Sequence, residues 1–244
     1  MAGSGSEPRY AGMTLARNGI VAITANYREG IFGFFAHPEL SKETAYRGSG
    51  NYGFLDQVAA IQWVKENISA FGGDPDRITI MGESAGSMSV SALMASPLSR
   101  NIIAQAMGSS GSVLGKDRWK TLAEAEQLGV EKVKSMGYKK IADLRKLSAD
   151  ELMRLAAVKS VPTYNIDGYF MPKQPMDICA PVRASPLPSF TLPVMLKWYW
   201  AKVSMQAASD SSTVNMASLF MSLSFLFVCL YPVKFVLVHE HHIL

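Results

Sequence analysis

A serine set between two glycines is the residue of this 244-residue chain that is best suited to chemistry. The segment Gly82–Gly86 reads Gly-Glu-Ser-Ala-Gly and has Ser84 at its centre. A serine hydroxyl is a weak nucleophile, so it must be presented where a base can reach it and where backbone N–H groups can face a developing oxyanion. A sharp strand-to-helix turn does this, and Gly-x-Ser-x-Gly is typical of such a nucleophile elbow. We therefore expect Ser84 to lie on a strained turn.

The sequence on either side of Ser84 supplies the two elements that the turn needs. Ile78–Met81 is a short apolar run rich in β-branched residues, and the small residues after Gly86 read as a helix. Strand, turn and helix then follow one another in the order that the elbow requires. The alternative is a chance serine in an ordinary strand-to-helix loop.

Strands and helices alternate along residues 1–178. The apolar run Ile20–Thr24 predicts a parallel strand buried on both faces, and apolar residues recur at helical spacing from Val58 to Phe71. This alternation implies βαβ units, hence an α/β fold with a mostly parallel sheet and helices on both faces. Met13–Arg17 is a short amphipathic stretch. The expected elements are strand Ile20–Thr24, helix Leu55–Phe71, strand Ile78–Met81 with the helix after it, strand Ala104–Ser109, and helices Trp119–Ser135, Ile141–Lys146 and Ala149–Val158.

Composition excludes several classes of function. The net charge is +4, from 24 Lys and Arg against 20 Asp and Glu, and no run of basic residues is dense enough for a nucleic-acid partner. Cys179 and Cys229 are the only cysteines, so the sequence predicts neither a disulfide framework nor a Cys-x-x-Cys metal site. Residues 1–8 are small and turn-like, without the apolar core of a signal peptide.

The character of the chain changes after Ile178. Four prolines from Pro181 to Pro193 mark an irregular linker, and no charged residue lies between Asp210 and Lys234. Spanning a bilayer takes about 20 apolar residues, which Met216–Val238 supplies if Lys234 snorkels. Three interpretations stay open for this tail: a transmembrane helix over about Met216–Val238, a foreign segment without selected structure, and a buried core helix.

With these motifs in order, the chain resembles the type-B carboxylesterase/cholinesterase family of α/β-hydrolases over about residues 3–178. The resemblance is most specific up to Gly111. The matching segments are Gly5-Ser-Glu-Pro8, Asn26-Tyr-Arg28 with Gly30, Phe32-Gly-Phe34, Gly50-Asn51, Leu55-Asp-Gln57, Trp63-Val64, Asn67-Ile68, Phe71-Gly-Gly-Asp-Pro75, Thr79-Ile80, Gly82–Gly86, Ser96-Pro-Leu98, Ser110-Gly111 and Asp167-Gly168.

This resemblance implies a partial α/β-hydrolase domain over residues 1–178 and an unrelated, Pro-rich and hydrophobic tail over 179–244. It implies hydrolysis of a small-molecule carboxylic ester with Ser84 as the nucleophile and the backbone N–H of Ala85 as one oxyanion-hole donor, without a cofactor or a metal. Family members are often secreted or periplasmic. The compartment and oligomeric state of this chain stay open, and membrane association through Met216–Val238 is one expectation.

The resemblance also implies parts that this sequence does not display. The family's glycine-rich oxyanion loop would precede Gly3, and the triad acid and histidine would lie beyond residue 178. We therefore expect a hydrolase truncated at both ends, which is weak or inactive as an isolated chain. The alternative from another class is a non-catalytic protein, either a truncated product or a membrane-tethered remnant.

The triad acid and base stay unassigned. His37 precedes the nucleophile and falls in a family-like loop, which makes it a poor candidate for the base, and His239, His241 and His242 lie at the extreme C-terminus. The acids after Ser84 have no spacing that singles one out. They include Asp117, Glu124, Glu126, Asp143, Asp150, Glu151, Asp167 and Asp177.

Overall fold

The computed structural model describes residues 12–113, 119–157, 164–179, 225–230 and 234–240. The elements belong to one compact unit, made of Met1–Cys179 and Ser224–Leu244. In chain order they are α1 Met13–Arg17, β1 Ile23–Tyr27, α2 Gly30–Gly33, α3 Pro38–Glu43, α4 Tyr52–Asn67, the 3-10 helix η2 Ile68–Phe71, β2 Ile78–Glu83, α5 Ala85–Ala95, β3 Gln105–Ser109, β4 Lys120–Thr121, α6 Leu122–Ser135, α7 Ile141–Leu144, α8 Ala149–Ala157, β5 Asn165–Ile166, α9 Pro175–Cys179, β6 Phe225–Leu230 and β7 Lys234–Glu240.

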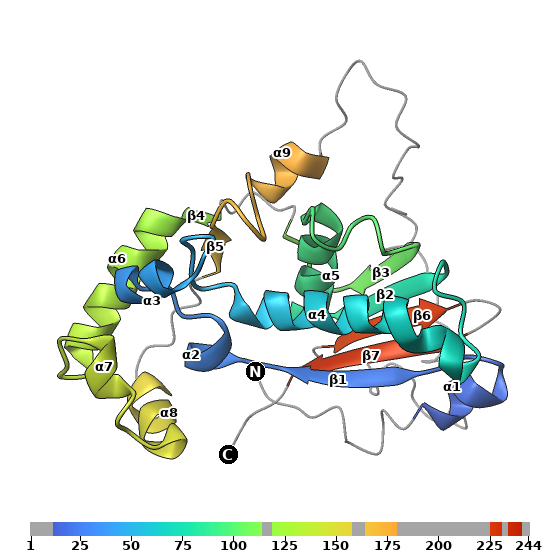
Figure 1. Ribbon diagram of the computed structural model, residues 1–244, viewed down its shortest axis with the longest axis horizontal. Coiled ribbons are helices and arrows are strands. Elements are labelled where there is room, and N and C mark those ends of the chain that lie inside the picture. Colours follow the sequence, from blue (N-terminus) through green and yellow to red (C-terminus); the bar gives the residue numbers. More distant parts are fainter. Residues whose placement is uncertain (1–11, 114–118, 158–163, 180–224, 231–233, 241–244) are drawn as a thin grey trace, which may run out of the picture. The chain divides into compact units, whose positions relative to one another are not determined.

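A five-stranded sheet is the centre of the fold, with the strand order β1-β7-β6-β2-β3 (Figure 1). β1, β7, β2 and β3 run in one direction, and β6 runs against them. The expectation of a mostly parallel α/β sheet is therefore confirmed. Helix α4 connects β1 to β2 and α5 connects β2 to β3, which are the crossovers that parallel strands require. β4 and β5 form a separate parallel pair.

The main core lies between the sheet and helices α4 and α5. Ile78 and Ile80 of β2 are fully buried, and α5 packs on β2 and β3 while α4 packs on β1. Phe54 of α4 stacks on Phe170 at a centroid distance of 4.8 Å and meets Phe34 edge-on at 5.1 Å. Of the apolar spacing that predicted α4, Val58, Ile61 and Val64 lie on its buried face, whereas Phe71 at the end of that spacing is 60% exposed.

β1 is more exposed than its sequence predicts. The strand runs over Ile23–Tyr27 and not Ile20–Thr24, and the side chains of Thr24 and Asn26 are exposed. β1 is an edge strand of the described sheet, with β7 as its one neighbour there. An apolar run cannot reveal which strand will lie at an edge, because that depends on pairing with distant segments.

The C-terminal tail departs most from expectation. Phe225–Leu230 and Lys234–Glu240 are strands β6 and β7, which pair with each other and occupy the sheet between β1 and β2. In the described residues of this tail, Phe225–Leu230 and Lys234–Glu240 are therefore strands and not parts of one helix, while 216–224 and 231–233 lie outside the described residues. In the part of the chain that the structure describes, no helix is both long and apolar enough to cross a bilayer.

Two properties explain why this tail forms strands. Both segments are rich in valine and phenylalanine, which fit a pleated surface, and Pro232 between them disfavours one continuous helix. The backbone N–H and C=O groups on the facing sides of β1 and β2 also need partners, which β7 and β6 provide.

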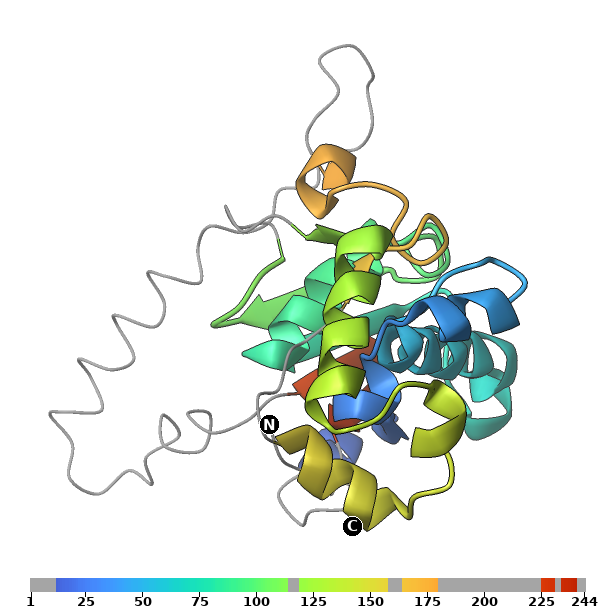
Figure 2. The ribbon, with the colours of Figure 1, turned by 90° about the vertical axis from the view of Figure 1, so that its left-hand side faces the viewer.

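A second apolar cluster is formed by residues of α6, α7 and α8 together with Phe35. These three helices are coloured from light green to yellow in Figure 2. The cluster contains Phe35, Val133 and Leu144, all buried. α6 approaches the chain closely at Gly129, where a Cβ atom would overlap the carbonyl oxygen of Ala36. Helix α6 begins with a capping box in which the Thr121 side chain accepts from the backbone of the third helical residue.

A buried amide joins the start of α4 to β5. Asn51 is fully buried, its Nδ2 donates to the backbone oxygen of Asn165 at 2.9 Å, and its Oδ1 accepts from the backbone nitrogen of Asn165 at 3.1 Å. This paired arrangement satisfies the Asn51 side chain and fixes segments that lie 114 residues apart.

Candidate functional site

Ser84 occupies the turn between β2 and α5, as the sequence predicts. Its backbone has φ 51° and ψ −114°, and it is one of three non-glycine residues with positive φ among the described residues. A side chain at positive φ crowds its own backbone, so this conformation costs about 1–3 kcal/mol and persists only where the surroundings determine it. The turn is thus a strained strand-to-helix turn.

Hydrogen bonds on both sides hold the Ser84 backbone. Its N–H donates to the carbonyl oxygen of Ser109 at the end of β3, at 2.8 Å. Its carbonyl oxygen accepts from the N–H of Met88 at 3.1 Å, which is the first hydrogen bond of helix α5. The turn is therefore attached to the neighbouring strand and to the helix it starts.

The N-terminus of α5 provides positive potential next to Ser84. Ala85 is the first residue of this 11-residue helix. First-turn N–H groups have no acceptor inside a helix, and the helix dipole adds a partial positive charge there. A negative oxygen that develops next to Ser84 would be stabilised by this end of α5.

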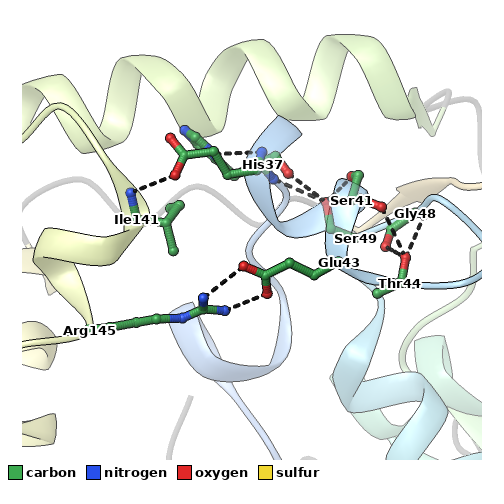
Figure 3. Close-up of polar contacts among 9 residues, drawn as sticks. His37, Ser41, Glu43, Thr44, Gly48, Ser49, Ile141 and Arg145 are labelled. Atoms are coloured by element: carbon green, nitrogen blue, oxygen red, sulfur yellow. Dashed lines mark hydrogen bonds and ion pairs between the residues drawn. The ribbon is translucent and has the colours of Figure 1, made fainter.

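His37 lies in a different polar cluster, shown in Figure 3. It caps helix α3, and its Nδ1 accepts a hydrogen bond from the Glu39 N–H at 3.2 Å. Its backbone N–H donates to Ser49 Oγ, which also lies 2.7 Å from Ser41 Oγ. His37 is 4% exposed, and burial lowers its pKa below the ordinary value, although Glu39 opposes this. These contacts make His37 a structural residue.

An ion pair fastens the same cluster to α7. Arg145 donates to both carboxylate oxygens of Glu43 at 2.7 Å, and the Glu39 carboxylate accepts from the Ile141 N–H (Figure 3). The hydrogen bonds from Arg145 lower the pKa of Glu43. The pair connects α3 to α7 across the second apolar cluster.

The C-terminal histidines fall partly within the described residues. In the register of the sheet, Phe225 of β6 pairs with both Glu83 and His239. The backbone of His239 is therefore two strands, about 10 Å, from that of Glu83. Both residues lie at the end of the sheet where Ser84 follows β2. His241 and His242 lie outside the described residues.

Four of the acids after Ser84 have other structural tasks. Glu124 and Glu151 each accept from a backbone N–H at the start of their helices, and Asp143 pairs with Lys146 at 2.9 Å. Asp167 accepts from the N–H groups of Tyr169 and Met171 in a turn. Asp117 lies outside the described residues.

Within the described part of the chain, these placements leave Ser84 Oγ without a hydrogen bond to an acid or a base. The same residues hold no group of three or more His, Cys, Asp or Glu side chains that could bind a metal ion. The sequence had singled out Ser84 and Ala85. Gly111 had entered only as part of the family resemblance, and the sequence had not singled out Ser87 or Gly108. All three residues pack around this turn, and the signal for Ser87 and Gly108 is only a small residue type at each position.

Comparison with known proteins agrees with the turn and the sheet. The model of the carboxylesterase family matches residues 1–192. Fumonisin B1 esterase of Sphingopyxis macrogoltabida is 47% identical over 154 residues, which are 63% of this chain and 27% of that protein. Para-nitrobenzyl esterase of Bacillus subtilis is 41% identical over 155 residues, covering 63% and 30%. The chain thus spans about a third of the length of the curated relatives it matches.

Solved structures show the same relation. A carboxylesterase of Geobacillus stearothermophilus has a TM-score of 0.60 and 37% identity, over 73% of this chain and 39% of that one. A PNB esterase has a TM-score of 0.62 and 33% identity, over 76% and 41%. These relatives have the α/β-hydrolase fold, and the order of β2, Ser84 and α5 is the order of its nucleophile elbow. The chain belongs to the carboxylesterase family.

Proposed function

We propose that the chain carries the nucleophile of a carboxylic-ester hydrolase and that Ser84 is this nucleophile. The observation that carries the proposal is the backbone of Ser84, a non-glycine residue at φ 51° between a buried strand and the N-terminus of a helix. A packed fold retains such strain at positions where function needs it. Membership of the carboxylesterase family supports esters as the substrate class.

The reaction would proceed through an acyl-serine. Ser84 Oγ attacks the ester carbonyl carbon while a base takes the hydroxyl proton, and the carbonyl oxygen becomes an oxyanion next to the N–H of Ala85. Collapse of this intermediate breaks the bond to the alcohol, which leaves with a proton. Water then adds to the acyl-serine and releases the carboxylic acid and Ser84. The atoms balance without a redox partner.

The substrate would be a small-molecule ester. Relatives include esterases named for fumonisin B1, para-nitrobenzyl esters and cocaine, and these ligands share little beyond the ester bond. The nucleophile turn is consistent with that shared chemistry, because it acts on the carbonyl and not on the flanking groups. Selectivity for one acid or alcohol would depend on residues around the turn.

We further propose that this chain, by itself, turns over esters slowly. Three of the described groups that could serve as base or acid have other tasks: His37 caps α3, and Glu124 and Glu151 cap helices. A serine that lacks its base loses several orders of magnitude in rate. If the rate of ester turnover by this chain is zero, the chain has a non-catalytic role, which is the alternative to this proposal.

A fluorophosphonate probe tests the nucleophile directly. The purified chain is incubated with the probe, and the modified peptide is identified by mass spectrometry. The proposal expects slow labelling at Ser84, none in Ser84→Ala, and unchanged labelling in Ser91→Ala, which alters the same helix away from the turn. A chain that remains unlabelled, or is labelled at another serine, would show that the turn carries no working nucleophile.

Turnover of p-nitrophenyl acetate tests the second part. We expect a rate close to that of the Ser84→Ala variant. Rates of ordinary esterases, abolished by Ser84→Ala, would refute the claim of weak activity and would show that a base does reach Ser84.

A further inference from the structure

The segment that follows β3 closes over the Ser84 turn. Ser109, the last residue of β3, accepts the hydrogen bond from the Ser84 N–H, and Ser110 next to it is a second non-glycine residue with positive φ, at 61°. At Gly111 a Cβ atom would overlap the carbonyl oxygen of Ser84. Gly111 therefore lies directly against the strained residue, and only a glycine fits there without displacing one of them.

Ser87 ties this segment to helix α5. It lies one turn after Ser84 and is 1% exposed. Its Oγ donates to the carbonyl oxygen of Gly111 at 2.5 Å. A Cβ atom at Gly108 would overlap the Ser87 hydroxyl. The Ser87 hydroxyl thus lies between Gly108 and Gly111. Its hydrogen bond fixes Gly111, the glycine that lies against Ser84.

We propose that Ser87 is a positioning residue for Ser84, acting through Gly111. The consequence for acyl transfer rests on the proposed function of Ser84, but the effect on the backbone does not. Ser87 holds Gly111 against the Ser84 carbonyl oxygen, while Ser109 holds the Ser84 N–H. Both peptide groups of the nucleophile are then fixed from β3, and the unfavourable backbone conformation is maintained.

The energetics favour such a role. A backbone conformation that costs about 1–3 kcal/mol relaxes unless its neighbours prevent it. Removing the Ser87 hydroxyl leaves the Gly111 carbonyl oxygen without this donor and opens a small space beside Gly108. Such a change releases a short segment locally without unfolding the core. The Ser84 N–H bond to Ser109 would then open more often.

Hydrogen exchange at the Ser84 amide measures this opening without any activity. In Ser87→Ala we expect the protection of the Ser84 amide, taken relative to that of the buried Ile80 amide in the same strand, to fall about tenfold. Ser91→Ala is the matched control. It removes the same atom from the same helix, where Ser91 Oγ donates only to the backbone oxygen of Ser87 at 3.0 Å. Its protection ratio should match the wild type.

Gly111→Ala approaches the same contact from the other side. It keeps the Ser87 hydroxyl but pushes the β3 segment away from Ser84, so it should also lower the protection ratio. If both variants leave this ratio unchanged, Ser87 does not position the turn and the inference is wrong. If Ser91→Ala lowers it equally, the effect belongs to α5 in general, which also overturns the inference.

Labelling kinetics connect the positioning to the proposed function. In Ser87→Ala the maximal rate constant for fluorophosphonate labelling should fall about tenfold, while the probe concentration at half-saturation should change less than about twofold. If the probe concentration at half-saturation rises by as large a factor as the maximal rate constant falls, the defect is merely structural, and this result would contradict the role in positioning. If Ser84 is never labelled but the protection ratio falls, the proposed function fails and the positioning of the backbone stands.

Discussion

Replacing Ser84 by glycine should stabilise the fold relative to replacing it by alanine. Both variants remove the hydroxyl, but alanine keeps the Cβ atom that crowds the backbone at φ 51° and ψ −114°. Glycine populates positive φ freely, so it relieves a strain of about 1–3 kcal/mol. The greater conformational freedom of glycine in the unfolded chain lowers the free energy of unfolding by about 0.5–1 kcal/mol and so offsets part of this gain. We therefore expect Ser84→Gly to have the larger free energy of unfolding, by about 1 kcal/mol.

Urea unfolding at equilibrium, followed by circular dichroism, measures this difference. At this chain length, about 1 kcal/mol corresponds to a shift of about 2–4 °C in the thermal midpoint, which is resolvable. Ser91, inside helix α5, supplies the control pair. There Ser91→Gly should be less stable than Ser91→Ala by about 1 kcal/mol, the opposite sign, because no strain is relieved.

The sign of the difference in free energy of unfolding between Ser84→Gly and Ser84→Ala shows whether the Ser84 backbone is strained. If Ser84→Gly is less stable than Ser84→Ala by about 0.5–1 kcal/mol, the value at unstrained positions, then the Ser84 backbone is not strained and Ser84 does not lie on a nucleophile turn of the proposed kind. Neither variant should react with a fluorophosphonate.

Three further predictions concern the surroundings of the site. Burial lowers the pKa of His37 in the folded chain below its ordinary value of 6.5, so the unfolded chain takes up the proton first as pH falls. The free energy of unfolding should therefore be highest above about pH 6.5 and should decrease as pH falls from there through the lower pKa of the folded chain. His37→Asn, which keeps a cap for α3, should remove this part of the pH dependence of the urea midpoint. Asn51→Asp replaces the amide that donates to the Asn165 carbonyl oxygen by a buried carboxylate, which can only accept. It should lower the free energy of unfolding by about 3 kcal/mol. Asn18→Asp is the control, because Asn18 makes the same kind of hydrogen bond on the exposed surface. Gly129→Ala would ordinarily favour a helix, but its Cβ would overlap the Ala36 carbonyl oxygen, so it should lower the thermal midpoint; a midpoint that rises would contradict this close contact.

Local patterns in the sequence identified most of the elements near the site. The run Ile78–Met81 predicted β2, and the helix after Gly86 appears as α5. Helical spacing found α4, although the structure begins it at Tyr52 and turns its end into a 3-10 helix. These predictions succeed because strand, turn and helix preferences are decided mainly by neighbouring residues.

Long-range pairing was beyond the reach of those patterns. The apolar tail read as a helix or an unrelated segment, whereas Phe225–Leu230 and Lys234–Glu240 pair with strands about 150 to 200 residues earlier. Short apolar runs fit a helix and a buried strand equally well, and pairing with the backbones of β1 and β2 decides between them. Similarly, the solvent exposure of β1 follows from its place at the edge of the sheet.

The sequence by itself determined the family, the position of Ser84 and the order of strand, turn and helix around it. Only the tertiary structure decided how that turn is held. Gly111 lies against the Ser84 carbonyl oxygen, Ser87 binds Gly111, and Ser109 accepts the Ser84 N–H. These residues approach Ser84 because β2 and β3 pair in register, and a contact between separate strands leaves no signal in the spacing of either one.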